Sequence, residues 1–147
     1  MSSYSEIIEN LSWNKTIDIQ KQAISILINA KDWNYAGCLK KTRKDIWQNM
    51  LKVIEKKTQG VQLELLDELL FLFQDLNWPG VDSAFNIITH LPRETIVPYI
   101  ENALLNAYKQ NDGMWIANLK KILEYFDFNH DTFRNIDFDT IISIADY

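Results

Sequence analysis

Two histidines and the carboxylates near them are the side chains in this sequence best suited to chemistry. His130 is flanked by Asp127 and Asp131, at spacings that could direct the three side chains to one side of a helix. Imidazole and carboxylate groups together bind zinc and other transition metals. His90 is distant in the sequence, no third firm ligand accompanies the pair, and the residues around Asn129 also fit a polar turn. We therefore predict no metal site and no cofactor.

The other catalytic patterns lead to the same expectation. Asp67 and Glu68 are adjacent, and adjacent residues do not converge on one helix face, as general acid–base catalysis requires. The sequence contains no glycine-rich phosphate loop, nucleophile elbow or zinc-ligand spacing. Cys38 is the single cysteine, and its flanking residues Gly37 and Leu39 indicate a small buried thiol rather than a nucleophile. We predict a protein that is not an enzyme and has no catalytic residue.

Two similar turns carry the predicted binding residues. Asp75 precedes Trp78 by three positions, and Asp112 precedes Trp115 by the same interval. Loops held by rigid elements often carry function, so Asp75, Asn77, Trp78, Asp112 and Trp115 are the predicted binding residues. The structural alternative is that the carboxylates cap helices or orient the turns, while the tryptophans fill the space between helices.

Composition indicates one globular domain over residues 1–147. The chain is 47% hydrophobic and 24% charged, and its four glycines and three prolines are few for a β protein rich in turns. The most apolar run, residues 69–73, is far shorter than the ~20 residues that cross a bilayer. Residues 1–13 lack the basic start and apolar core of a signal peptide. We expect a soluble cytoplasmic protein with no membrane contact.

Charge is distributed unevenly along the chain. Residues 1–58 hold ten Lys and Arg against six Asp and Glu, whereas residues 59–147 hold five against fourteen. A nucleic-acid-binding protein normally has a dominant basic surface, so no nucleic-acid partner is predicted. The cluster of Lys40, Lys41, Arg43 and Lys44 could contact phosphate, but a solvated helix end explains it equally simply.

Apolar residues at intervals of three, four and seven predict the helices that position the two turns. The predicted helices are residues 16–30, 42–54, 61–76, 79–91, 96–109 and 113–126, with short helical segments at 6–11 and 139–145. Thr42 is the predicted N-cap of the second helix, and Pro79 falls in the first turn of the fourth. A buried strand is the alternative for residues 69–73, and the length of the periodic pattern favours a helix.

Pairs of helices that recur every ~35–45 residues are typical of helical-hairpin solenoids. Tetratricopeptide repeats are one option, because the run from Trp33 to Gly37 resembles the opening of that repeat. The later small residues and the strict spacing of that repeat are missing. The predicted fold is therefore all-α, built from HEAT/armadillo-like helical hairpins.

A resemblance to a known family rests on three segments: Leu72 to Gly80, Asp112-x-x-Trp115, and Leu119 to Leu123. These segments resemble an uncharacterised family of small HEAT-like helical proteins, a domain of unknown function found mostly in bacteria. The most specific part is the run Gln-Asp-Leu-Asn-Trp-Pro-Gly, which contains the Asn-Trp-Pro-Gly signature. The resemblance implies a right-handed α-α superhelix. Some relatives resemble immunity proteins that neutralise polymorphic bacterial toxins.

Three functions are consistent with these observations. The first is a non-enzymatic protein-interaction module whose acidic C-terminal part suits a basic protein partner, with an immunity-type protein that binds a basic toxin as one concrete version. The second is a scaffold or subunit of a larger assembly. The third is a HEAT-like nucleic-acid repair enzyme, which requires a basic groove that the acidic half of the chain opposes. Oligomeric state does not follow from the sequence.

Overall fold

The computed structural model describes residues 4–146, and within that range the chain forms helices and no strand. The predicted all-α class is confirmed, and none of the described helices is long and apolar enough to cross a bilayer. The elements are α1 (Tyr4–Glu9), α2 (Ile17–Asn29), α3 (Lys44–Glu55), α4 (Gln59–Glu64), α5 (Leu66–Phe71), the 3-10 helix η1 (Leu72–Gln74), α6 (Val81–Thr89), α7 (Arg93–Lys109), α8 (Gly113–Phe126) and α9 (Phe138–Ser143).

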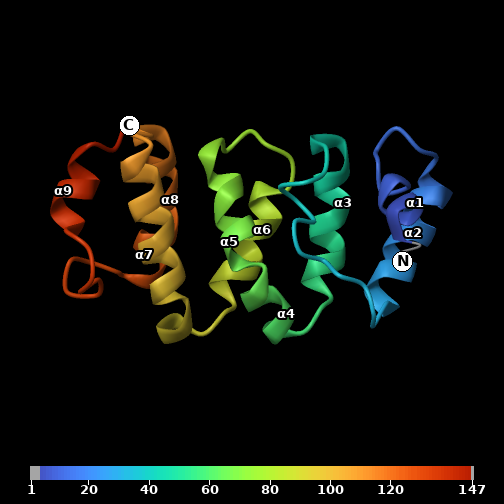
Figure 1. The fold of residues 1–147 in the computed structure, drawn as a ribbon, viewed down its shortest axis with the longest axis horizontal. Coiled ribbons are helices and arrows are strands. Elements are labelled where there is room, and N and C mark those ends of the chain that lie inside the picture. Colours follow the sequence, from blue (N-terminus) through green and yellow to red (C-terminus); the bar gives the residue numbers. More distant parts are fainter. Residues whose placement is uncertain (1–3, 147) are drawn as a thin grey trace.

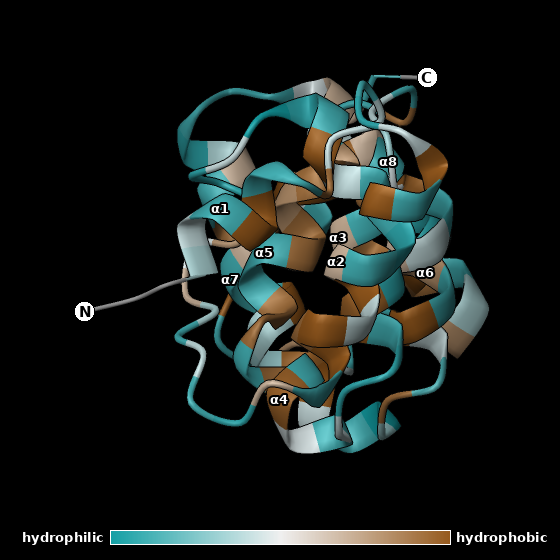
Figure 2. Cartoon of the chain, turned by 90° about the vertical axis from the view of Figure 1, so that its right-hand side faces the viewer, coloured by the Kyte–Doolittle hydropathy of each residue, from teal (hydrophilic) through white to brown (hydrophobic). Residues whose placement is uncertain are grey.

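The helices stand side by side in a row, with α1 and α2 at one end and α9 at the other (Figure 1). Viewed along the row, α5 and α7 lie on one side and α6 and α8 on the opposite side (Figure 2). Helix α2 packs on α3, α3 on α6, and α6 on α8, while α5 packs on both α6 and α7. Helix α6 is therefore central to its side of the row, between α3 and α8.

Helix starts follow the capping chemistry of the sequence in some places and not in others. The Thr16 and Asp112 side chains accept hydrogen bonds from the backbone N–H groups of Ile19 and Trp115, at the starts of α2 and α8. The prediction that Thr42 is an N-cap is wrong, because α3 begins at Lys44. The Thr42 hydroxyl instead donates to the Cys38 carbonyl.

The single helix predicted for residues 61–76 is wrong, because three shorter elements occupy that stretch: α4, α5 and η1. Helix α4 ends at Glu64 and lies across the end of α3, where the Gln62 amide donates to the Ile54 carbonyl at 3.0 Å. That bond adds a side-chain donor to a carbonyl in the last turn of α3, which also accepts from the Lys57 backbone N–H at 3.0 Å. The chain therefore bends near Leu65, although neither proline nor glycine marks the bend.

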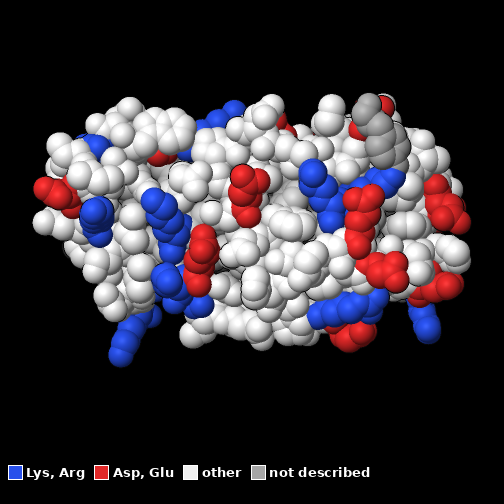
Figure 3. All heavy atoms as spheres, turned by 180° about the vertical axis from the view of Figure 1, so that it is seen from behind, with Lys and Arg blue, Asp and Glu red and all other residues white. Residues whose placement is uncertain are grey.

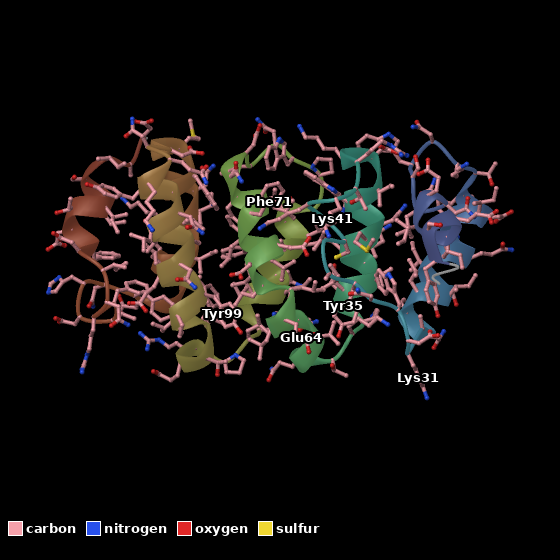
Figure 4. All side chains as sticks on the ribbon, viewed as in Figure 1. Lys31, Tyr35, Lys41, Glu64, Phe71 and Tyr99 are labelled. Atoms are coloured by element: carbon pink, nitrogen blue, oxygen red, sulfur yellow. The ribbon has the colours of Figure 1, made fainter. Side chains whose placement is uncertain are left out.

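A loop precedes α3 and packs against α5. The buried Glu68 carboxylate accepts hydrogen bonds from the backbone N–H groups of Gly37, Leu39 and Lys40, at 2.6, 2.9 and 3.0 Å. Three such bonds to one charged acceptor fix the path of the loop. Near the start of the same loop, the Tyr35 hydroxyl lies close to the Glu64 carboxylate (Figure 4), with an O–O distance of 3.1 Å.

Candidate functional site

The two predicted turns are ordered by their aspartates. The Asp75 carboxylate accepts a hydrogen bond from the Asn77 backbone N–H at 2.8 Å and so holds the turn after η1. The Asp112 carboxylate accepts from the Trp115 N–H at 3.0 Å and caps α8. Both carboxylates therefore have a structural role, holding a turn or capping a helix, which was the alternative to a binding role.

The tryptophans of the two turns differ in position. Trp115 lies in the first turn of α8, whereas Trp78 lies in the turn before α6, which begins only at Val81. The prediction that Pro79 occupies the first turn of a helix is therefore wrong. Gly80 separates the proline from the helix, with φ of 90°, a left-handed conformation that glycine adopts without the cost imposed by a Cβ atom.

Trp115 is a packing residue with one polar contact. Its side chain is 6% exposed, and its indole N–H donates to the Leu70 carbonyl at 3.1 Å. One turn later, the buried Asn118 amide donates to the Phe73 carbonyl at 2.8 Å. The acceptors of these two bonds are carbonyls at the end of α5 and in η1. Side chains of α8 therefore supply hydrogen-bond donors to the C-terminal end of that helical segment.

Trp78 belongs to a cluster of three aromatic rings. Its ring centroid lies 5.5 Å from that of Trp47 and 5.6 Å from that of Phe71. The Lys44 ammonium lies 4.9 Å from the Trp78 centroid, and the Lys40 ammonium lies 5.5 Å from the Phe71 centroid. Both lysines make cation–π contacts of the usual kind. Figure 4 places Phe71 near the loop that carries Lys41.

Two surface hollows lie beside the turn at residues 74–77, next to α6 and α8, and Leu76 lines both. On one side of Leu76 is a hollow of about 390 Å³ lined by Phe73, Leu76, Val81, Asp82, Phe85, Lys121 and Glu124. On the other side is a hollow of about 300 Å³ lined by Gln74, Asp75, Leu76, Asn77, Met114 and Asn118. We call these two hollows together the Leu76 groove.

The Leu76 groove combines exposed apolar side chains with a mostly acidic rim. Leu76 is 37% exposed and Met114 is 52% exposed. The rim carries Asp82 and Glu124, with Lys121 as the one base that lines the two hollows. On the side of the row formed by α6 and α8, charged side chains are sparse in the middle and more frequent toward both ends (Figure 3).

A third hollow, of about 660 Å³, lies between α7 and residues 127–135. Its wall includes Arg93, whose guanidinium donates to the Phe126 carbonyl and lies 4.7 Å from the Phe128 ring centroid. The buried Glu101 carboxylate accepts from the Asn135 backbone N–H at 3.2 Å and anchors this loop. Because these charged groups already have structural partners and the lining is largely polar, the Leu76 groove is the better candidate for binding.

The histidines lie apart and outside the Leu76 groove. The His130 Nε2 atom is 3.3 Å from an Asp131 carboxylate oxygen on the exposed loop after α8. The His90 Nδ1 atom is 2.7 Å from the Asn86 carbonyl, which can only accept, so Nδ1 carries the proton. Across residues 4–146, the His, Cys, Asp and Glu side chains form no group of three that could hold a metal ion.

Two of the five predicted binding residues, Asp75 and Asn77, line the Leu76 groove. Asp112 and Trp115 position the first turn of α8, from which Met114 reaches the groove, and Trp78 lies in the aromatic cluster next to it. Sequence reasoning missed Leu76 and Met114. The sequence does contain a sign that these two residues are exposed. Each is a large apolar residue that lies beside a turn and does not belong to the apolar stripe of the adjacent helix.

The fold and the groove define an all-helical protein with a shallow acidic and apolar surface groove. The chain belongs to the family described as Domain of unknown function (DUF5071), whose sequence model matches residues 38–131. The matched segment extends from the loop before α3 to the loop after α8 and so contains the whole groove. Neither a curated protein nor a solved structure matches the chain.

Proposed function

We propose that this chain is a non-catalytic protein-binding module whose Leu76 groove holds a positively charged segment of a partner protein. One observation carries the proposal: exposed Leu76 lines two hollows, one of them floored by Phe73, Val81 and Phe85 and bordered by Asp82 and Glu124. Exposed apolar surface bordered by polar groups is characteristic of protein interaction sites.

Each part of the groove suits a different part of such a segment. The hollow floored by Phe73, Val81 and Phe85 accepts a bulky apolar side chain, and burial of that side chain supplies the affinity. Met114 is unbranched and adapts its shape to the bound side chain. The carboxylates of Asp82 and Glu124 favour Lys or Arg beside the apolar anchor and raise the association rate.

The resemblance of the Gln74 to Gly80 run to small HEAT-like proteins supports a right-handed α-α superhelix as the architecture that presents the groove. Within that proposal, the row of helices is a short solenoid, and such solenoids commonly bind partners along an extended surface. An immunity-type protein that neutralises a basic toxin is the concrete form of this function. Its support is the acidic rim and the excess of Asp and Glu after residue 58.

A peptide-display selection on the immobilised protein tests the proposal. Enriched peptides should carry Lys or Arg next to a large apolar residue. In fluorescence polarisation, Leu76→Ser should weaken their binding at least about tenfold, because the central apolar contact is lost. Ile26→Ser is the matched control, since Ile26 is 46% exposed on α2 and lies outside the groove.

The charge requirement is tested separately with Asp82→Asn combined with Glu124→Gln. These changes keep side-chain size and should reduce the salt dependence of peptide binding as well as its strength. The proposal is overturned if selection yields no peptide, or if the selected peptides bind the Leu76→Ser and Ile26→Ser variants equally well.

A further inference from the structure

A fourth hollow lies between α5 and α7, on the side of the row opposite α6 and α8 (Figure 2). It is small, about 160 Å³, and three of the residues that line it are almost fully buried: Leu70, Ala103 and Trp115, each at most 6% exposed. These three side chains form an apolar floor. The bond from the Trp115 indole to the Leu70 carbonyl fixes two of them relative to each other.

The wall of the fourth hollow carries four exposed polar side chains: Lys40, Asp67, Asn102 and Asn106. Asn102 and Asn106 are four residues apart on α7, so their carboxamides lie on the same face of the helix. Each carboxamide can both donate and accept hydrogen bonds. The wall therefore offers one positive charge, one negative charge and two carboxamides around an apolar floor.

The fold places the two charges close to each other along α5. The Lys40 backbone N–H donates to the buried Glu68 carboxylate at 3.0 Å, and the Lys40 ammonium lies 5.5 Å from the Phe71 ring centroid. Asp67 precedes Phe71 on α5 by about one helical turn, which rises ~5.4 Å. The ammonium and the carboxylate thus lie at neighbouring positions on one wall, and the two carboxamides face them from α7.

Neither of these charges is neutralised by another side chain. Among residues 4–146, Lys40 and Asp67 form no ion pair with each other or with any other group. The ring of Phe71 holds the Lys40 cation without cancelling its charge. The third hollow differs, because its Arg93 and Glu101 already bond to the backbone. Both charges of the fourth hollow are therefore available to a ligand.

We propose that the fourth hollow binds a free α-amino acid with a small apolar side chain. Such a molecule carries an ammonium group and a carboxylate on one carbon atom, so both of its charges fit beside the two charges of the wall. Its ammonium donates to Asp67, and its carboxylate accepts from Lys40. Asn102 and Asn106 add hydrogen bonds to these groups, and the apolar side chain packs on the floor beside Trp115.

The size and charge of the hollow favour this ligand class over others. At ~30 Å³ for each water molecule, the hollow holds about five waters, which leaves no room for a nucleotide or a disaccharide. A neutral sugar would shield both wall charges from water without pairing them, at a cost in free energy. A peptide carries its two charges at opposite ends of the chain, too far apart for one small hollow.

Chemical-shift titration of the isotope-labelled protein with L-valine tests the proposal. The amide signals of residues 67–71 and 102–106 should shift. The compound 3-methylbutanoate lacks only the ammonium group of valine, and 2-methylpropylamine lacks only its carboxylate. Each should bind at least about tenfold more weakly, because one charge-assisted contact is lost. Glycine keeps both charges and should also bind at least about tenfold more weakly, because it has no apolar side chain.

The variants Lys40→Met and Asp67→Asn keep side-chain size and should each weaken L-valine binding at least about tenfold. Lys31→Met and Asp18→Asn are the matched controls and should bind as the wild type does. Both control residues are exposed and lie outside the hollow, and Figure 4 shows Lys31 far from Phe71. Circular dichroism checks that every variant remains helical.

Three results would overturn the proposal: no shift with L-valine at any soluble concentration, equal binding of valine and its two singly charged analogues, or equal binding by the Lys40→Met and Asp67→Asn variants and their controls. The inference does not depend on the proposed function, because the Leu76 groove lies beside α6 and α8. Peptide binding there is measured with different ligands and different variants.

Discussion

The indole N–H of Trp115 donates a hydrogen bond to the carbonyl oxygen of Leu70, 3.1 Å away, and ties the start of α8 to the end of α5. A similar bond joins the Trp47 indole to the Leu39 carbonyl at 2.8 Å, where α3 meets the loop before it. Each of these tryptophans thus combines a large apolar surface with a donor that satisfies a buried carbonyl. Such contacts hold α8 on α5 and α3 on the loop before it.

Trp115→Phe keeps an aromatic ring and removes the indole N–H. The Leu70 carbonyl then loses its side-chain partner in a buried position, so the free energy of unfolding should fall by about 1–3 kcal/mol. Urea unfolding followed by circular dichroism measures the change. Trp13→Phe is the control and should have little effect, because Trp13 is 53% exposed. Equal losses in the two variants would contradict the role assigned to Trp115.

Gly80→Ala tests the turn that carries Leu76. Gly80 has φ of 90°, and an added Cβ would lie 3.0 Å from the Leu51 Cδ2 atom, so we expect a loss of about 1–3 kcal/mol in unfolding free energy. Gly60→Ala is the control. An added Cβ at Gly60 would make one ordinary contact, 3.8 Å from the Thr58 Oγ1 atom, and Gly60 lies in α4, where alanine should stabilise by up to about 1 kcal/mol. Destabilisation by Gly60→Ala, with none by Gly80→Ala, would refute this assignment.

Arg43 links stability to acid pH. Its guanidinium donates to Glu9 on α1 and to Asp45 on α3, and these hydrogen bonds lower the pKa of both carboxyl groups from the ordinary values of 4.5 and 3.8. The unfolded chain therefore binds more protons than the folded chain, and this stabilisation is lost as pH falls through the lowered pKa values.

The unfolding free energy should consequently fall less between pH 6 and pH 3 in Arg43→Met than in the wild type. Urea titrations at a series of pH values measure this difference. Arg134→Met is the comparison variant, because Arg134 is exposed and forms no ion pair among the described residues. It should retain the pH dependence of the wild type, and identical slopes for all three proteins would exclude the linkage.

Cys38 should resist alkylation in the folded protein. Burial raises the pKa of its thiol well above the ordinary value, and the nearby Glu68 carboxylate raises it further. The reactive thiolate is therefore scarce at neutral pH. Iodoacetamide labelling followed by mass spectrometry should be at least about tenfold slower than in urea-unfolded protein. Labelling at the same rate in both states would contradict the burial of this thiol.

Much of the helical framework could be predicted from the sequence, because capping residues and apolar spacing act locally. Asp112 and the stripe after it predicted α8, and Thr16 predicted the start of α2. The bend near Leu65 could not be predicted, because neither proline nor glycine marks it and it accompanies the packing of α4 across the end of α3, where the Gln62 amide donates to the Ile54 carbonyl. Periodicity alone extends a helix through such a bend.

The groove was only partly predictable for a related reason. The turn from Asp75 to Trp78 stood out through its residue types, and Asp75 and Asn77 do line the groove. The partners that complete it, Met114 and Glu124, come from a helix that begins more than thirty residues later, and only the packing of α6 on α8 brings them close. Whether any of these residues binds a partner stays a prediction.

The most direct test of the account is chemical-shift mapping of isotope-labelled protein on titration with a selected basic peptide. The account predicts that the amide signals that shift most belong to residues 75–82, Met114, Asn118 and the Lys121–Glu124 turn of α8. Signals from the hollow beside α7, such as Arg134 and Asn135, should stay unchanged. Shifts concentrated there, or on α2, would contradict the claim that the Leu76 groove is the binding site.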